Sequence, residues 1–176
     1  MATSTAQAAD ISGKELADKL FSDCDAALAD PASVLALADI TSEAPAMATT
    51  DGKVLSATIT LTDAEGDFIG ANFVTARSLP GGTAVSCMLT LYGNVVRDET
   101  RASLHDTTLA NAHALIGEDG VTVGGAVGGP ALLKMADAPT EVKVLASPDF
   151  PPSASVAIAT SDGFTNVTVE RFRAAP

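Results

Sequence analysis

The sequence has few of the side chains on which most binding and catalytic sites depend. Its 176 residues include no Trp, one Tyr, two His and two Cys. Sugar-binding sites rely on Trp and Tyr rings, and a zinc site needs three or four His, Cys or carboxylate ligands. The composition therefore disfavours a carbohydrate-binding or zinc-dependent protein, and we expect no cofactor.

Basic side chains are scarce as well. Ten Lys and Arg stand against 22 Asp and Glu, which gives a formal net charge of −12. Nucleic-acid phosphates and anionic membrane surfaces repel a chain with this excess of negative charge. No apolar run approaches the roughly 20 residues that a membrane-spanning helix needs. We therefore expect no direct nucleic-acid partner and no membrane span.

The N-terminal segment lacks the features of a secretory signal. Residues 1–10 contain neither a basic region nor an apolar region, and both are needed for export by that route. We expect an extended arm over 1–10 and a protein made in the cytoplasm without a signal peptide. Two cysteines 63 positions apart, Cys24 and Cys87, are expected to be buried free thiols in a reducing compartment.

Small aliphatic residues are what the chain has in abundance. It contains 33 Ala, while Leu, Ile, Val and Phe together make 42 of the 176 residues, or about 24%. That fraction exceeds the roughly 20% below which disorder is expected. The length fits one domain. We expect a single β-rich domain over 11–176.

Two helices are predicted from spacing and capping residues. Ser12 and Glu15 form a capping box at the start of a helix over 13–29. Its apolar stripe recurs every four residues, at Leu16, Leu20, Cys24 and Leu28. A second helix over 98–116 would end at Gly117.

Other segments alternate between apolar and hydroxyl-bearing residues, the pattern of a strand with one solvated face. The clearest cases are 55–62 and 83–92, and a weaker one is 68–77. Consecutive strands joined by turns at 63–67 and 80–82 predict an antiparallel meander.

Further strands are expected nearer the C-terminus. Short β-like pieces lie at 121–127 and 141–146, and a hairpin turns at Ser161-Asp162-Gly163. The fold class predicted is mainly β (α+β): an antiparallel β-sandwich with an N-terminal helix and a middle helix.

Candidate catalytic and metal-binding residues do not form a recognisable motif. The acidic segment 63–67 resembles a calcium loop, but an EF-hand needs Gly and Glu where Phe68 and Val74 stand. His105 and His113 are eight residues apart and lack the spacing of zinc ligands. Surface positions on the middle helix explain both histidines. We therefore expect no catalytic or metal site.

One uncharged, glycine-rich segment stands out. From Val121 to Leu133 there is no charged residue, and its glycines match neither of the common phosphate-binding spacings. Such a segment is rarely left in water. We expect a neighbouring subunit or the core to cover it. The candidate subunit-interface residues are Val121, Val123, Gly124, Gly125, Val127, Gly128, Gly129, Leu132 and Leu133.

These features together favour assembly over chemistry. A positive mean hydropathy without a membrane segment indicates apolar surface that partners cover. We expect a non-enzymatic structural subunit of a homo-oligomeric assembly, with a virion capsid, decoration or tail protein as the leading example. Its partners would be copies of itself and other subunits of the particle. The alternative is a β-sandwich or barrel that binds a small apolar ligand, and a hydrolytic enzyme is the third hypothesis.

Overall fold

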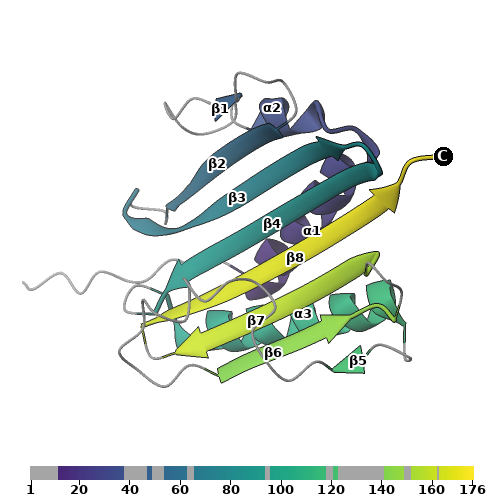
Figure 1. Cartoon of the computed structure of the whole chain (residues 1–176). Coiled ribbons are helices and arrows are strands. Elements are labelled where there is room, and N and C mark those ends of the chain that lie inside the picture. The colour runs from purple at the N-terminus through teal and green to yellow at the C-terminus, as the bar shows by residue number, and fades with distance from the viewer. Residues whose placement is uncertain are drawn as a thin grey trace, which may run out of the picture.

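All strands in the described part of the chain belong to one antiparallel sheet, seen in Figure 1 with the helices behind it. The computed structural model describes residues 12–37, 47–48, 54–62, 66–93, 96–117, 121–122, 141–148, 152–161 and 163–176. The strand order is β1-β2-β3-β4-β8-β7-β6-β5. The strands are β1 (Met47–Ala48), β2 (Val54–Thr62), β3 (Phe68–Leu79), β4 (Gly82–Tyr92), β5 (Val121–Thr122), β6 (Glu141–Ala146), β7 (Ala154–Ser161) and β8 (Phe164–Ala174). The helices are α1 (Gly13–Ala29), α2 (Ser33–Leu37) and α3 (Asp98–Ile116).

Two meanders meet at the centre of the sheet, where β4 pairs with β8. At one end of this pair the Gly93 N–H donates to the Gly163 carbonyl, and at the other the Ala175 N–H donates to the Gly81 carbonyl, both at 2.9 Å. The two bonds occupy equivalent places in the two meanders. The β2–β4 and β6–β8 meanders are therefore related by an approximate two-fold axis between β4 and β8, a relation that the sequence did not reveal.

Helices cover one face of the sheet. α1 lies against β3, β4 and β8, while α3 lies against β6 and β7 (Figure 1). The two helices meet closely at Gly13, where a side chain would collide with the backbone of α3. The α+β class is confirmed, but the expected sandwich is not: the described strands form one open sheet. The helices supply the cover that the prediction assigned to a second sheet, because every C-terminal strand extends the same sheet.

Alternation along the strands separates the two faces, as predicted for 55–62 and 83–92. The residues that face the helices are buried and apolar, among them Val74, Cys87, Leu89, Val167 and Val169. Their neighbours along each strand point to the opposite side. We call this opposite side the open face.

The helix boundaries agree with the sequence. The Ser12 side chain accepts a hydrogen bond from the Glu15 N–H at 3.3 Å at the start of α1. Gly117 ends α3 with φ 82°, a conformation that favours glycine. The predicted arm over 1–10 lies outside the described residues, as does most of the strand predicted over 121–127.

The expectation of two free thiols is wrong. Cys24 and Cys87 form a disulfide with a Cα–Cα distance of 5.8 Å, within the usual range for this bond. Both side chains are fully buried. Cys24 belongs to the buried stripe of α1, and Cys87 belongs to the helix-facing side of β4. Packing of α1 on the sheet brings the two together, and their sequence separation gave no sign of it.

Candidate functional site

Only a small part of the interface predicted from the sequence falls within the structure. Val121 lies in β5 at one edge of the sheet, where it pairs with Ala146. The remaining predicted interface residues lie outside the described residues: Val123, Gly124, Gly125, Val127, Gly128, Gly129, Leu132 and Leu133. The segment therefore stays a prediction from the sequence.

The open face offers a second candidate surface, and cross-strand pairing arranges its side chains in rows. One row runs over four strands through Thr58, Phe73, Met88 and Thr168. The next runs through Ser56, Thr75, Ser86, Glu170 and Ser155. A third runs through Val54, Arg77, Ala84 and Phe172. Within these rows all side chains are exposed or half-buried, so this part of the face is accessible in the single chain.

Charge is nearly absent from the three rows. Arg77 and Glu170 are their two charged members, and both are exposed. Ser155 Oγ donates to Glu170 Oε2 at 3.1 Å, the Ser56 and Thr75 hydroxyls are 3.1 Å apart, and the Thr168 hydroxyl donates to Asn166 Oδ1 at 3.2 Å. The chain carries a net charge of −12, but these rows carry one positive and one negative charge. These three rows of the open face thus carry no net charge, although the protein is acidic.

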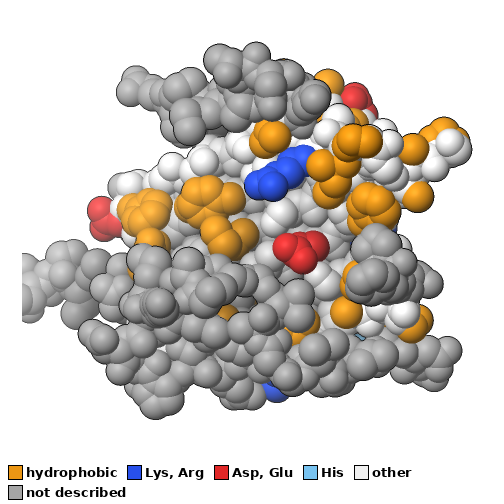
Figure 2. All heavy atoms as spheres, in the orientation of Figure 1, with side chains coloured by type: hydrophobic (Ala, Val, Ile, Leu, Met, Phe, Trp, Pro, Cys, Tyr) orange, Lys and Arg blue, Asp and Glu red, His pale blue; other side chains and the backbone are white. Residues whose placement is uncertain are grey.

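A broad hollow of about 720 Å³ lies in this face. Arg77 and Glu170 line it together with the apolar side chains of Leu79, Pro152 and Phe172. Figure 2 shows basic and acidic side chains in the middle of the face, with hydrophobic side chains on both sides of them. The hollow therefore has two opposite charges between apolar walls.

Large hydrophobic side chains are also exposed near the ends of the central strands. Phe68, Leu79 and Tyr92 are 50%, 46% and 43% exposed. The Phe68 and Tyr92 rings pack at a centroid distance of 5.5 Å. Exposed aromatic and aliphatic side chains next to a neutral face are typical of surfaces that bind another molecule.

The two histidines both lie on α3, and within the described residues neither belongs to a group of three possible metal ligands. His105 Nδ1 lies 3.2 Å from an oxygen of Asp106, and His105 Nε2 lies 3.5 Å from Lys143 Nζ. His113 is exposed near the end of α3. Nowhere in the described ranges do three His, Cys, Asp or Glu side chains gather as metal ligands. Most of the acidic segment 63–67 falls outside those ranges.

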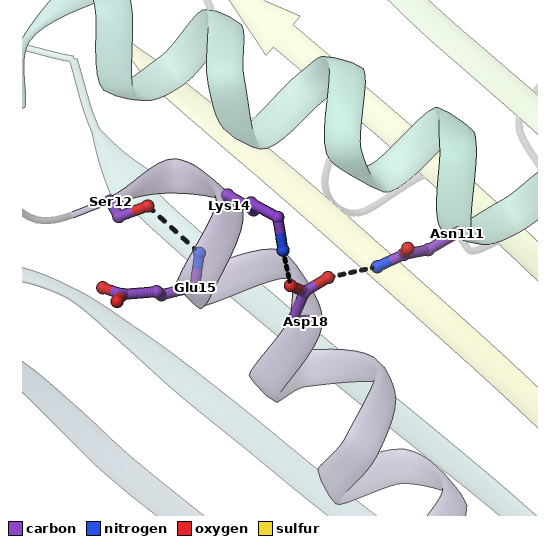
Figure 3. Close-up of polar contacts among 5 residues, drawn as sticks. All are labelled: Ser12, Lys14, Glu15, Asp18 and Asn111. Carbon is purple, nitrogen blue, oxygen red and sulfur yellow. Dashed lines mark hydrogen bonds and ion pairs between the residues drawn. The ribbon is translucent and has the colours of Figure 1, made fainter.

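A polar cluster joins α1 to α3 on the other side of the molecule (Figure 3). Asp18 forms an ion pair with Lys14 one helical turn earlier, and it accepts a hydrogen bond from Asn111 Nδ2 at 3.0 Å. The Asn111 bond, followed by the contact with Lys14, lowers the pKa of the Asp18 carboxyl below its ordinary value. The same contact with Asp18 raises the pKa of the Lys14 ammonium. Each group has its own partner, so the cluster serves to hold the helices together.

We expect Asn111→Ala to raise the pKa of the Asp18 carboxyl toward its ordinary value, measured by NMR titration of the side-chain carbon. A lowered folded-state pKa means that the contact stabilises the protein above the ordinary carboxyl pKa. That contribution is lost as the pH falls through the lowered value. Lys14→Met is the matched comparison: it removes the ion pair, keeps the Asn111 bond and is also expected to raise the Asp18 pKa. A larger rise in Lys14→Met than in Asn111→Ala would show that the ion pair dominates.

Comparison with protein-family models, with curated proteins and with solved structures found no match. Among the described helices, none is both long and apolar enough to cross a membrane.

The sequence predicted that the Ser and Thr side of these strands is solvated, but it did not identify that side as a binding surface. Arg77 and Glu170 are 93 positions apart, and the β4–β8 pairing places them on neighbouring rows of one face. The alternation of each strand could have assigned each residue to a face. The pairing of the two meanders had no signal in the sequence.

Proposed function

We propose that this protein is a non-enzymatic structural subunit of a homo-oligomeric assembly, and that the open face of its sheet is a contact surface between subunits. The observation that carries the proposal is that the three rows of this face described above are exposed or half-buried and carry no net charge, on a chain with a net charge of −12. The core of a protein interface is depleted of charge and enriched in aromatic residues and Arg. Phe73, Phe172 and Arg77 fit that composition.

A partner sheet on the open face would complete a sandwich. Two sheets pack with about 10 Å between them when their inner faces carry interdigitating side chains. The helices occupy one side of this sheet, so a second sheet would pack on the open side. The sandwich expected from the sequence would then form between two chains.

The disulfide supports a role outside a reducing compartment. Disulfides persist in oxidising surroundings and are rare among cytosolic proteins. A virion subunit is made in the cytoplasm, as the sequence predicts for this chain. It is later carried outside the cell, where a disulfide persists. A capsid, decoration or tail protein is therefore our proposal for the kind of assembly, with other subunits of the particle as further partners.

We expect the purified protein to self-associate at high micromolar concentration. Size-exclusion chromatography with light scattering should give a molar mass that is a multiple of the 17.7 kDa chain mass and that falls on dilution. A β-sheet protein with fully covered faces and similar charge is the control for the column. A constant mass of one chain across the concentration range would overturn the proposed function.

The hollow in the open face favours a second candidate, the binding of a small ligand with an apolar body. Its volume of about 720 Å³ lies within the usual range of ligand sites. A ligand that binds the folded state raises the midpoint of thermal unfolding, and above its dissociation constant the rise grows with the logarithm of its concentration. A monomeric protein whose midpoint rises with a medium-chain fatty acid would favour this function over assembly.

A further inference from the structure

We infer that the occupant of the open face is a second copy of this chain, related by a two-fold axis, and that Arg77 of each copy pairs with Glu170 of the other. This inference rests on the proposed function and specifies its geometry. A two-fold contact brings the same patch of both subunits together, so residue i meets residue j and j meets i. A patch with one positive and one negative charge is self-complementary under this rule.

The charge pattern selects a second copy over a partner of strong charge. A markedly basic or acidic partner would leave either Arg77 or Glu170 opposite a like charge, which costs binding energy. Two identical neutral faces satisfy both residues at once. Within the described part of the chain neither of the two forms an ion pair, and the Glu170 carboxylate accepts a bond from Ser155. Both charges are thus available to a partner.

The register of the sheet allows the reciprocal contact. β4 lies between β3, which carries Arg77, and β8, which carries Glu170. The two residues are two strands and one row apart, a Cα separation of about 12 Å on an ideal sheet. The two-fold axis of such a contact lies between the two sheets and parallel to them. Placed midway between Arg77 and Glu170, it passes over β4 near Ala84 and Ser86. These small side chains allow the two sheets to approach each other at the axis.

The hydrophobic side chains on both sides of the charged pair would complete the contact. Phe73 and Met88 lie beside the axis on the row next to Ser86, and Phe172 lies on the row of Ala84. Aromatic and Met side chains are enriched in interface cores. The charged pair then fixes the orientation of the two copies, and the apolar rows supply the buried surface.

Two charge reversals test the pairing. In Arg77→Glu alone, two acidic side chains meet at each contact, and in Glu170→Arg alone, two basic ones meet. We expect each variant to raise the dimer dissociation constant about 100-fold, because two attractive contacts become repulsive. Mixed in equal amounts, the two variants should form a heterodimer with close to the original affinity, since every contact then joins opposite charges. Sedimentation velocity on each variant and on the mixture measures both effects.

Arg173→Glu is the matched control. Arg173 is an exposed residue of β8 that lies on the opposite side of the sheet from Glu170. It changes the net charge as Arg77→Glu does and should leave the dissociation constant unchanged. Circular dichroism confirms that each variant is folded, and recovery in the mixture rules out a folding defect independently. Wild-type self-association that survives both single reversals would overturn this interface and leave the assembly proposal standing. A monomeric wild type would overturn both.

Discussion

Reduction of the Cys24–Cys87 disulfide is expected to lower the free energy of unfolding by about 4 kcal/mol. The bond closes a loop with a sequence separation of 63. Removal of a cross-link of this span restores conformational entropy to the unfolded chain, and loop-closure arguments place the effect near that value. The bond also ties the central strand β4 to α1, the helix that covers the middle of the sheet. Its loss removes the covalent link between the two layers.

Urea denaturation with and without a reducing agent measures this effect. The double variant Cys24→Ala/Cys87→Ala should unfold at a lower urea concentration than the oxidised protein, and the reducing agent should not change its midpoint. This insensitivity separates loss of the disulfide from any other action of the reductant. Equal midpoints for the oxidised and reduced wild type would contradict the prediction.

Gly13→Ala is expected to destabilise the fold by about 3 kcal/mol, the upper part of the range for overpacked sites. An added Cβ would lie 2.1 Å from the Thr100 carbonyl oxygen and 2.5 Å from the Leu104 nitrogen. Both contacts are with backbone atoms of α3, so the two helices would have to move apart. Replacement of Gly by Ala inside a helix ordinarily stabilises by about 0.5–1 kcal/mol. The expected sign is therefore opposite to the helix propensity.

The control for this substitution is Gly81→Ala in the turn between β3 and β4. An added Cβ there meets no atom within 4 Å, so we expect a change within about 0.5 kcal/mol. Thermal or urea unfolding of both variants gives the comparison. A stabilised Gly13→Ala protein would show that α1 and α3 do not cross as closely as the structure indicates.

The helix boundaries and the two sides of the strands could be predicted from residues close together in the sequence. The Ser12 cap and the four-residue recurrence of apolar side chains placed α1 at its observed boundaries. Gly117 marked the end of α3 for a conformational reason. The alternation of β2 and β4 assigned each side chain to a solvated or buried side before any pairing was known. These signals succeed because capping and alternation depend on neighbours within a few residues.

Long-range features were harder to predict because they depend on which elements meet. The sandwich prediction failed to foresee that the C-terminal meander extends the first sheet at β4. The free-thiol prediction failed because the covering of β4 by α1 decides the partner of Cys87. Neither the β4–β8 pairing nor the disulfide can be predicted from the spacing of residues within a strand or helix.

By itself the sequence determined an acidic, aromatic-poor chain with helices over 13–29 and 98–116 and with strands whose two sides differ. Only the tertiary structure decided that one side of those strands is covered by helices and that Arg77 and Glu170 lie near each other on the other side. The physical reason is that composition, capping and alternation are properties of short segments. Strand pairing and helix packing are set by the burial of apolar surface across the whole chain.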